Sequence, residues 1–315
     1  MKNKDSQMPK IVFTTSLFNL DNLAERDAIE KAGYELVLNP YGRRLTELQL
    51  SEILDEMVVG MVAGVEPITA AVLKKARSLK VISRCGIGMD NVDIETARSL
   101  GISLFNTPDS PTISVAELTL AHIMSLVRRV SEADRAIRKG QWEPMMGSLL
   151  AKQIVGVIGF GRIGQAVTRL LTVFGAHVLV YDIMTKSVDS IELVNLEELL
   201  TRSDIVTLHV PYTADTHHLI NTERIALMKP TALLVNVARG GLIDELALFT
   251  ALQENRLGGA ALDCFKQEPY SGPLLALENV QMTAHMGSYA REARAMMEQE
   301  AGENLVRGLR AHGLL

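Results

Sequence analysis

Short apolar runs alternate with amphipathic stretches along most of the chain. Near the beginning, KIVFTTS at 10–16 is followed by DNLAERDAIEKAG, and YELVLNP is followed by TELQLSEILDEM. Parallel strands need crossovers of about a dozen residues or more, which are usually helices, so this alternation predicts open parallel sheets flanked by helices. The expected fold class is α/β.

A long helical stretch separates two blocks of this alternation. Residues 114–142 (SVAELTLAHIMSLVRRVSEADRAIRKGQW) are predicted to form one helix, with Ser114 and Glu117 at the spacing of a capping box. A second alternating block starts with QIVGVIGFG, and residues 289–309 predict one last amphipathic helix. A length of 315 residues leaves room for two domains of roughly 150 residues each.

The composition argues against several classes of function. Lys and Arg number 32 against 37 Asp and Glu, a net charge of -5, and no block of like charges could track a phosphate backbone, so no nucleic-acid partner is expected. The longest stretches without these residues, 170–181 and 279–290, fall short of the roughly 20 apolar residues of a membrane span. No apolar signal region follows the N-terminus, so a cytoplasmic protein is expected. Cys85 and Cys264 are expected to be reduced thiols, and their spacing indicates no metal site.

The strongest single motif is a glycine-rich turn between an apolar run and a helical stretch. Gly159 allows a tight turn, Gly161 lets the backbone approach a pyrophosphate, and Gly164 lets the helix pack on the strand. Such a motif alone is also compatible with a glycine turn that binds no nucleotide. The next apolar run, HVLVY, ends in Asp182, at the spacing of the acid that binds ribose hydroxyls. Its carboxylate would repel a 2'-phosphate, so NAD is favoured over NADP.

Polar residues follow three later apolar runs. They are Arg239, then Asp263 and Glu268, and finally His285. Ligands bind at the carboxyl ends of such strands. An Arg can hold a carboxylate bidentately, and a His exchanges protons near neutral pH, with a carboxylate such as Glu268 stabilising its charged form. Taken singly, an Arg here also fits a surface ion pair and a His fits a structural role, and His122 in the long helix is interpreted as packed or solvated.

Together these segments resemble the D-isomer-specific 2-hydroxyacid dehydrogenase family. The resemblance rests on VGVIGFGRIG with Asp182, LHVPYTADTHHLI, NVARGGLIDE, ALDCFKQEP and TAHMG, and SRCGIGMDNVD with NTPDSPTISVAELT points to its phosphoglycerate-dehydrogenase-like branch. It implies reversible hydride transfer between NAD(H) and C2 of a small 2-hydroxy or 2-keto acid, with D-3-phosphoglycerate as one candidate. Arg239 would hold and polarise the substrate, His285 would be the acid and base, and Glu268 would orient and charge His285.

The resemblance also implies binding residues. The backbone amides of the segment 85–88 would hold the substrate carboxylate, and Asp263 would meet the nicotinamide side of NAD. The implied substrate-binding residues are Cys85, Gly86, Ile87, Gly88, Arg239 and His285. The implied cofactor-binding residues are Gly159, Gly161, Arg162, Ile163, Gly164, Asp182, Val210, Pro211, Thr216, Val237, Ala238, Arg239, Asp263, His285, Gly287 and Ser288.

The family architecture implies two domains with parallel sheets. A Rossmann NAD-binding domain would hold 105–285, and a discontinuous flavodoxin-like substrate domain would hold 1–104 and 286–315, with a cleft between them that closes on the substrate. The family also implies a homodimer formed through the nucleotide domain, with the helix from Ser114 in its interface.

One departure from the family pattern bears on the substrate. Phosphoglycerate dehydrogenases commonly carry an Arg-Ser pair after the third strand, whereas VAGVEPIT places Ala63 and Gly64 there and adds Glu66. Without that cation a phosphate would lose charge-assisted bonds worth about 1.5 to 3 kcal/mol each, unless Arg84 compensates. A hydroxypyruvate or glyoxylate reductase of the same family is therefore an alternative, and a non-enzymatic NAD-sensing module of the corepressor type is another.

Overall fold

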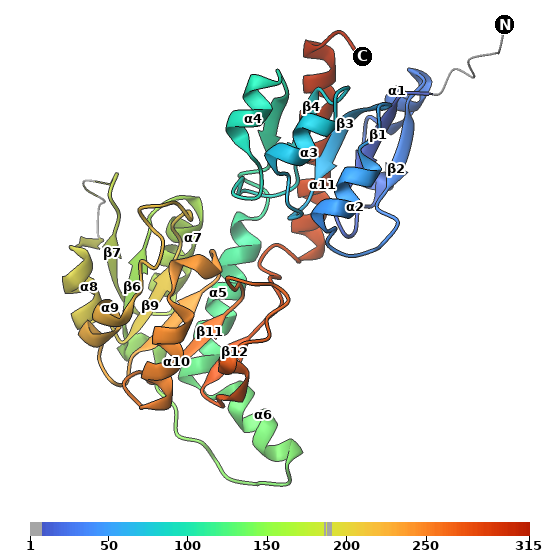
Figure 1. Ribbon diagram of the computed structural model, residues 1–315. Coiled ribbons are helices and arrows are strands. Elements are labelled where there is room, and N and C mark those ends of the chain that lie inside the picture. The colour runs from blue at the N-terminus through green and yellow to red at the C-terminus, as the bar shows by residue number, and fades with distance from the viewer. Residues whose placement is uncertain (1–7, 186, 188–190) are drawn as a thin grey trace, which may run out of the picture. The chain divides into compact units, whose positions relative to one another are not determined.

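The computed structural model describes residues 8–185, 187 and 191–315, which form two compact units (Figure 1). One unit holds the described residues up to Pro111 together with Ala290–Leu315, and the other holds Thr112–Tyr289. All strand pairs in both units are parallel, which confirms the predicted α/β class.

The first unit is built on a five-stranded sheet with the order β2-β1-β3-β4-β5, the flavodoxin-like order. Its strands are β1 (Lys10–Phe13), β2 (Glu35–Leu38), β3 (Val58–Ala63), β4 (Val81–Arg84) and β5 (Ser103–Asn106). Its helices are η1 (Leu20–Asn22), α1 (Arg26–Lys31), α2 (Glu47–Ile53), α3 (Ala70–Lys75), α4 (Ile94–Ser99) and α11 (Arg291–Ala311). Because β5 completes the sheet, this unit continues past the boundary predicted at residue 104.

Helices cover both faces of this sheet. Along β1, Val12 belongs to the core beneath α2, α3 and α4, while Ile11 and Phe13 belong to the core beneath α1 and α11. Helix α11 comes from the other end of the sequence and lies against β3, β4 and β5 (Figure 1). A Cβ on Gly308 would lie 2.6 Å from Val81 Cγ1, so a glycine lets this helix approach the sheet.

The second unit has a seven-stranded sheet with the order β12-β11-β10-β9-β6-β7-β8. Its strands are β6 (Ile154–Ile158), β7 (His177–Tyr181), β8 (Glu192–Leu193), β9 (Ile205–Leu208), β10 (Leu233–Asn236), β11 (Gly259–Leu262) and β12 (Val280–Met282). Its helices are α5 (Thr112–Val127), α6 (Val130–Arg138), η2 (Leu150–Lys152), α7 (Arg162–Val173), α8 (Leu196–Arg202), α9 (Thr222–Leu227), η3 (Gly240–Leu242), α10 (Glu245–Gln253) and η4 (Pro273–Ala276). From β6, the strands β7 and β8 are added on one side of the sheet and β9 to β12 on the other. This change in strand order makes the carboxyl end of β6 the switch point of a Rossmann fold.

The long helix predicted over 114–142 is wrong in one respect. Two helices, α5 and α6, replace it, and Arg129 between them has the left-handed φ of 53°. A residue in that conformation cannot continue a right-handed helix, so the chain turns there. Apolar periodicity through this region did not reveal the break.

The predicted capping box at Ser114 is also wrong. Helix α5 begins two residues earlier, at Thr112, and the Ser114 hydroxyl donates to the carbonyl oxygen of Gly287 at 2.7 Å. A partner far away in the sequence therefore takes the hydroxyl that local spacing had assigned to the helix start. The last predicted helix, over 289–309, is confirmed as α11.

Within the described part of the chain, no helix combines the length and the apolar character needed to cross a membrane.

Candidate active site

The loop between β6 and α7 has the geometry of a phosphate cradle. Gly159 has a φ of 96°, and a Cβ there would lie 2.6 Å from the carbonyl oxygen of His209. A Cβ on Gly164 would lie 2.0 Å from the Gly159 carbonyl oxygen, so only glycine lets the helix pack against the turn. Gly161, the N-cap of α7, has open space where a Cβ would stand. The amides at the start of α7 can therefore be reached by an anion such as a pyrophosphate.

Asp182 follows β7 and is tied to this loop. One carboxylate oxygen accepts the Phe160 amide at 2.7 Å, and the other accepts the amides of Met184 and Thr185, each at 2.8 Å. Burial opposes the charged form, but these amides hold the pKa of Asp182 below its ordinary value. Asp182 is therefore a fixed negative charge beside the glycine loop, as an acceptor for ribose hydroxyls requires.

His285 and Glu268 form a pair in the second unit. His285 Nδ1 lies 3.0 Å from both carboxylate oxygens of Glu268, and one of these oxygens also accepts the Phe265 amide at 3.1 Å. The two side chains are 33% and 22% exposed, so they are reachable from solvent. Because Nδ1 faces the carboxylate, Nε2 is the ring nitrogen that can exchange a proton with a ligand.

Asp263 holds the loop on which His285 stands. Its carboxylate accepts the Thr283 hydroxyl at 2.6 Å and the amides of Met286 and Gly287, each at 2.8 Å, and its main-chain oxygen accepts the His285 amide at 2.7 Å. The family resemblance implies that Asp263 meets the nicotinamide side of NAD, and the hydrogen bonds that it makes to the His285 loop were not predicted.

His122 is a residue whose place the sequence left undecided between packing and solvation. It lies on α5, is 5% exposed, and its Nε2 is 3.1 Å from the Thr283 hydroxyl oxygen. Burial lowers the pKa of His122, although the Asp263 charge opposes this effect. A lone polar residue on an apolar helix face was the only signal that the sequence offered.

Arg239 follows β10 in a turn fixed by its neighbours. The buried Asn236 side chain accepts the Ala238 amide at 3.0 Å and donates to the Arg239 carbonyl oxygen at 2.8 Å. The Arg239 guanidinium donates to the Ala238 carbonyl oxygen at 2.8 Å and remains half-buried.

The Arg239 turn lies against the segment that leads to Glu268. A Cβ on Gly240 would lie 1.9 Å from the Phe265 carbonyl carbon, so the two segments touch through a glycine. Cys264, the residue before Phe265, is buried, and burial raises the pKa of its thiol well above its ordinary value. The structure therefore brings Arg239 into the neighbourhood of the His285–Glu268 pair.

The other predicted cofactor residues also follow strands or open a helix in the second unit. Val210 packs on the glycine loop, with its Cγ1 2.8 Å from where a Gly159 Cβ would stand. The Thr216 hydroxyl donates to the Pro211 carbonyl oxygen at 2.7 Å. Arg162 and Ile163 begin α7, Val237 and Ala238 follow β10, and Gly287 and Ser288 follow His285.

In the first unit, the segment 85–88 directs its carbonyl oxygens toward protein donors. These bonds are Arg84 Nη1 to the Cys85 oxygen at 2.7 Å, the Thr107 amide to the Gly86 oxygen at 3.1 Å, and Asn106 Nδ2 to the Ile87 oxygen at 2.8 Å. The Cys85 amide is taken up by the Ala63 carbonyl oxygen at 2.8 Å, so the amides of Gly86, Ile87 and Gly88 are the ones outside these bonds. Burial raises the pKa of the Cys85 thiol to about 11, which makes it an inert packed group.

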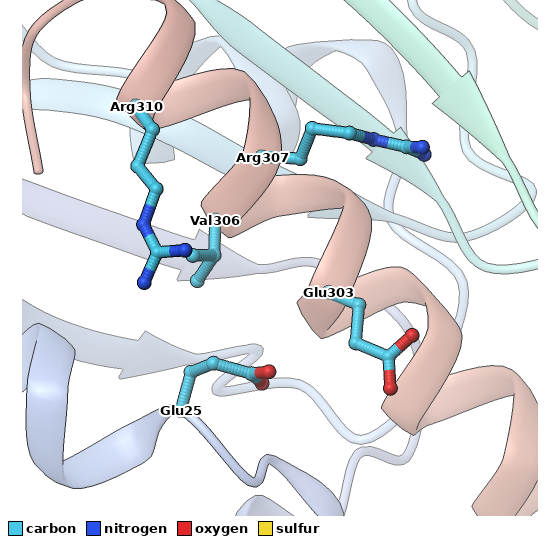
Figure 2. A pocket seen from close by; sticks show the side chains of 5 residues that line it. All are labelled: Glu25, Glu303, Val306, Arg307 and Arg310. Carbon is cyan, nitrogen blue, oxygen red and sulfur yellow. The ribbon is translucent and has the colours of Figure 1, made fainter.

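The first unit also contains a pocket beside α11 (Figure 2). It is lined by Glu25, Glu303, Val306, Arg307 and Arg310, so charges of both signs surround it. None of the residues predicted from the sequence lines this pocket. Among the described residues, no group of three His, Cys, Asp or Glu side chains could hold a metal ion.

The second unit defines a class of protein. Its strand order reverses beside a glycine loop, and a hydrogen-bonded carboxylate ends the neighbouring strand. This is the arrangement of a dinucleotide-binding dehydrogenase domain.

Comparison with known proteins identifies the family. Residues 120–287 match the family model "D-isomer specific 2-hydroxyacid dehydrogenase, NAD binding domain". The chain is 42% identical over 274 residues to the D-3-phosphoglycerate dehydrogenase of Methanocaldococcus jannaschii, and the match covers 84% of this chain and 52% of that relative. The chain therefore spans about half the length of that relative. It is 35% identical over 295 residues to the hydroxypyruvate reductase of Thermotoga maritima, with 90% of this chain and 96% of the relative covered.

A solved structure agrees with these relatives. The D-lactate dehydrogenase from Aquifex aeolicus, complexed with NAD and lactic acid, matches with a TM-score of 0.83 at 29% identity over 96% of each chain. The chain belongs to the D-isomer-specific 2-hydroxyacid dehydrogenases, which confirms the family and the NAD-binding domain predicted from the sequence.

Proposed function

We propose that this chain is an NAD-dependent dehydrogenase that moves a hydride between NAD(H) and C2 of a small 2-hydroxy or 2-keto acid. The observation that carries the proposal is the His285–Glu268 pair, held at 3.0 Å beside the turn of Arg239. NAD, when bound, supplies or accepts the hydride. The glycine cradle and Asp182 fit that cofactor because the cradle admits an anion and Asp182 accepts hydroxyl groups.

The protein's own groups handle the proton and the substrate charge. His285 Nε2 takes the hydroxyl proton during oxidation and returns it during reduction, while Glu268 stabilises the imidazolium that forms. Arg239 binds the substrate carboxylate and polarises the carbonyl oxygen, which a planar and permanently charged group can do bidentately. In the first unit, the amides of Gly86, Ile87 and Gly88 are proposed to bind the substrate carboxylate.

The relatives favour short 2-hydroxy and 2-keto acids. One relative is named for phosphoglycerate, one for hydroxypyruvate, and the solved structure holds lactic acid. D-3-phosphoglycerate therefore stays a candidate beside the hydroxypyruvate and glyoxylate reductase alternatives.

A direct spectrophotometric screen tests the proposal. The purified chain is incubated with NADH and, separately, with hydroxypyruvate, glyoxylate, pyruvate and 3-phosphohydroxypyruvate, and the loss of NADH absorbance is followed. We expect turnover of at least one of them, with NADH preferred over NADPH. Binding of NADH without turnover of any keto acid would instead support the corepressor-type module.

A homodimer formed through the second unit is also proposed. Helix α6 and the segment after it expose large apolar side chains, among them Trp142 at 85%, Met146 at 87% and Leu149 at 64% exposed. Exposed apolar side chains gathered in one segment are typical of a protein interface. Light scattering of wild type and of Trp142→Ser tests this: we expect a dimer that weakens in the variant.

The cytoplasmic location stays a prediction, which cell fractionation would test.

A further inference from the structure

A buried histidine of the second unit lies behind the loop of His285. His122 stands in the middle of α5, and its Nε2 is 3.1 Å from the hydroxyl oxygen of Thr283, the residue just after β12. Neither the hydride transfer nor the proton transfer proposed above uses His122.

The direction of this hydrogen bond follows from the proton count. The Thr283 hydroxyl has one proton and donates it to the Asp263 carboxylate at 2.6 Å. The contact with His122 must then have Nε2–H as its donor. A buried imidazole without a carboxylate in direct contact is also expected to stay neutral.

The hydrogen bonds from His122 to Thr283 and from Thr283 to Asp263, which we call the relay, end on the loop that carries His285. Asp263 accepts the amides of Met286 and Gly287, each at 2.8 Å, and its main-chain oxygen accepts the His285 amide at 2.7 Å. His285 itself has a φ of 52°, in the left-handed region that residues other than glycine rarely adopt. Such a conformation persists only where surrounding bonds fix it.

We propose that His122 is a positioning residue for proton transfer: through Thr283 and Asp263 it fixes the loop on which His285 meets Glu268. The proposal rests on the function proposed for His285. His122 touches neither substrate nor cofactor in this scheme, and its effect passes entirely through the two hydrogen bonds of the relay.

The first test replaces the donor and then restores it. His122→Leu removes the Nε2–H while filling a buried apolar position, and we expect kcat to fall about tenfold, the effect of one buried hydrogen bond, with KM for NADH unchanged. His122→Gln places an amide N–H near the position of Nε2 and should recover most of kcat. Thr119→Val is the matched control, because Thr119 is buried on the same helix and donates only to the Val115 carbonyl oxygen, at 2.7 Å.

The second test is a double-mutant cycle with Thr283→Val, which breaks the relay at its middle. If both residues act through one relay, His122→Leu adds little to the loss caused by Thr283→Val. Additive losses, a full kcat in His122→Leu, or an equal loss in Thr119→Val would each overturn the proposal. If His122→Leu does not fold, His122→Gln is compared with His122→Asn, whose amide falls short of the Nε2 position. A kcat of His122→Gln no higher than that of His122→Asn would also overturn the proposal. A wild-type chain without turnover would overturn both this proposal and the proposed function, whereas an active wild type with an unaffected His122→Leu overturns this one alone.

Discussion

The carboxyl ends of the two sheets offer different chemistry. In the second unit, the segments after β10, β11 and β12 carry Arg239, Glu268 and His285, whose side chains are partly exposed. In the first unit, the segment after β4 is rich in glycine, and its charged neighbours Arg84 and Glu66 are 7% and 1% exposed. Proton transfer needs a side chain that changes protonation, whereas binding a carboxylate needs only oriented N–H groups. The two edges therefore offer different groups to a ligand: side chains that can exchange protons in the second unit, and oriented N–H groups in the first.

Two carboxyl groups sharpen the contrast. Asp182 in the second unit is half-buried, and three amides hold its pKa below the ordinary value. Glu66 in the first unit accepts the Gly64 amide at 2.9 Å and the Thr14 hydroxyl, yet burial dominates and raises its pKa. Similar hydrogen bonds therefore give opposite shifts, because the loss of water around Glu66 is nearly complete.

The largest effect is expected where the chemistry depends on a side chain. His285→Ala should lower kcat by about 10² to 10⁴, the usual loss of a general acid and base, while KM for NADH stays within a few-fold. Steady-state kinetics with an accepted keto acid measures this. Wild-type turnover in the variant would remove His285 from proton transfer.

The next effect tests whether the first unit works through its backbone. A Cβ on Gly86, whose φ is 144°, would lie 1.2 Å from Arg84 Nη1, which donates to the Cys85 carbonyl oxygen. Gly86→Ala should therefore displace this guanidinium, remove its hydrogen bond to the loop, and raise KM for the keto acid about tenfold or more. Gly101→Ala is the control: its φ of 71° brings similar strain of about 1 to 3 kcal/mol, but nothing lies within 4 Å of the new Cβ. Both variants should lose thermal stability, and only Gly86→Ala should change KM. Equal KM values in the two would contradict a substrate role for this loop.

A smaller effect is expected for the coenzyme preference. Asp182→Ala removes the carboxylate that accepts the ribose hydroxyls and whose charge repels a 2'-phosphate. A hydrogen bond to a charged group is worth about 1.5 to 3 kcal/mol. The ratio of kcat/KM for NADH over NADPH should fall by about tenfold or more. Melting curves without nucleotide separate this effect from the loss of the three amide contacts of Asp182. An unchanged ratio would contradict its role.

The smallest effect concerns stability alone. Because the pKa of Glu66 is raised in the folded chain, the folded state holds a proton that the unfolded chain releases, and stability falls as pH rises from the ordinary glutamate pKa through the raised one. Glu66→Gln has no such proton, so its thermal midpoint should exceed that of wild type by a few degrees at alkaline pH and by less under acid. Glu56→Gln, at an exposed position, is the control for the substitution itself. A Glu66→Gln advantage that grows as pH falls would reverse the sign.

The candidate site of the second unit was predicted from local rules. The glycine turn before α7 needs residues without a Cβ at Gly159 and Gly164, and steric limits of this kind are visible in residue types alone. Glu268 and His285 are separated by only 17 residues and follow adjacent parallel strands, so their pairing could be anticipated. The roles of these residues stay predictions until the variants are measured.

Sequence reasoning did less well where a partner is distant. Ser114 has the spacing of a helix cap but bonds Gly287, 173 positions away. His122 bonds Thr283 across 161 positions, and a single histidine on an apolar helix face does not reveal such a partner. The Cys85 amide was expected to face a substrate, and pairing with Ala63 on the neighbouring strand takes it up instead.

The sequence by itself determined the alternation of strands and helices, the glycine cradle, and the order in which Arg239, Glu268 and His285 follow their strands, because each depends on residue type and short-range spacing. Only the tertiary structure decided which hydrogen-bond partners meet. Asp263 accepts amides of the His285 loop, His122 bonds Thr283 behind that loop, and the buried Glu66 accepts an amide at the carboxyl end of the other sheet. The physical reason is that burial and hydrogen bonding depend on what surrounds a group in space, and neighbours in space come from strands and helices far apart in the chain.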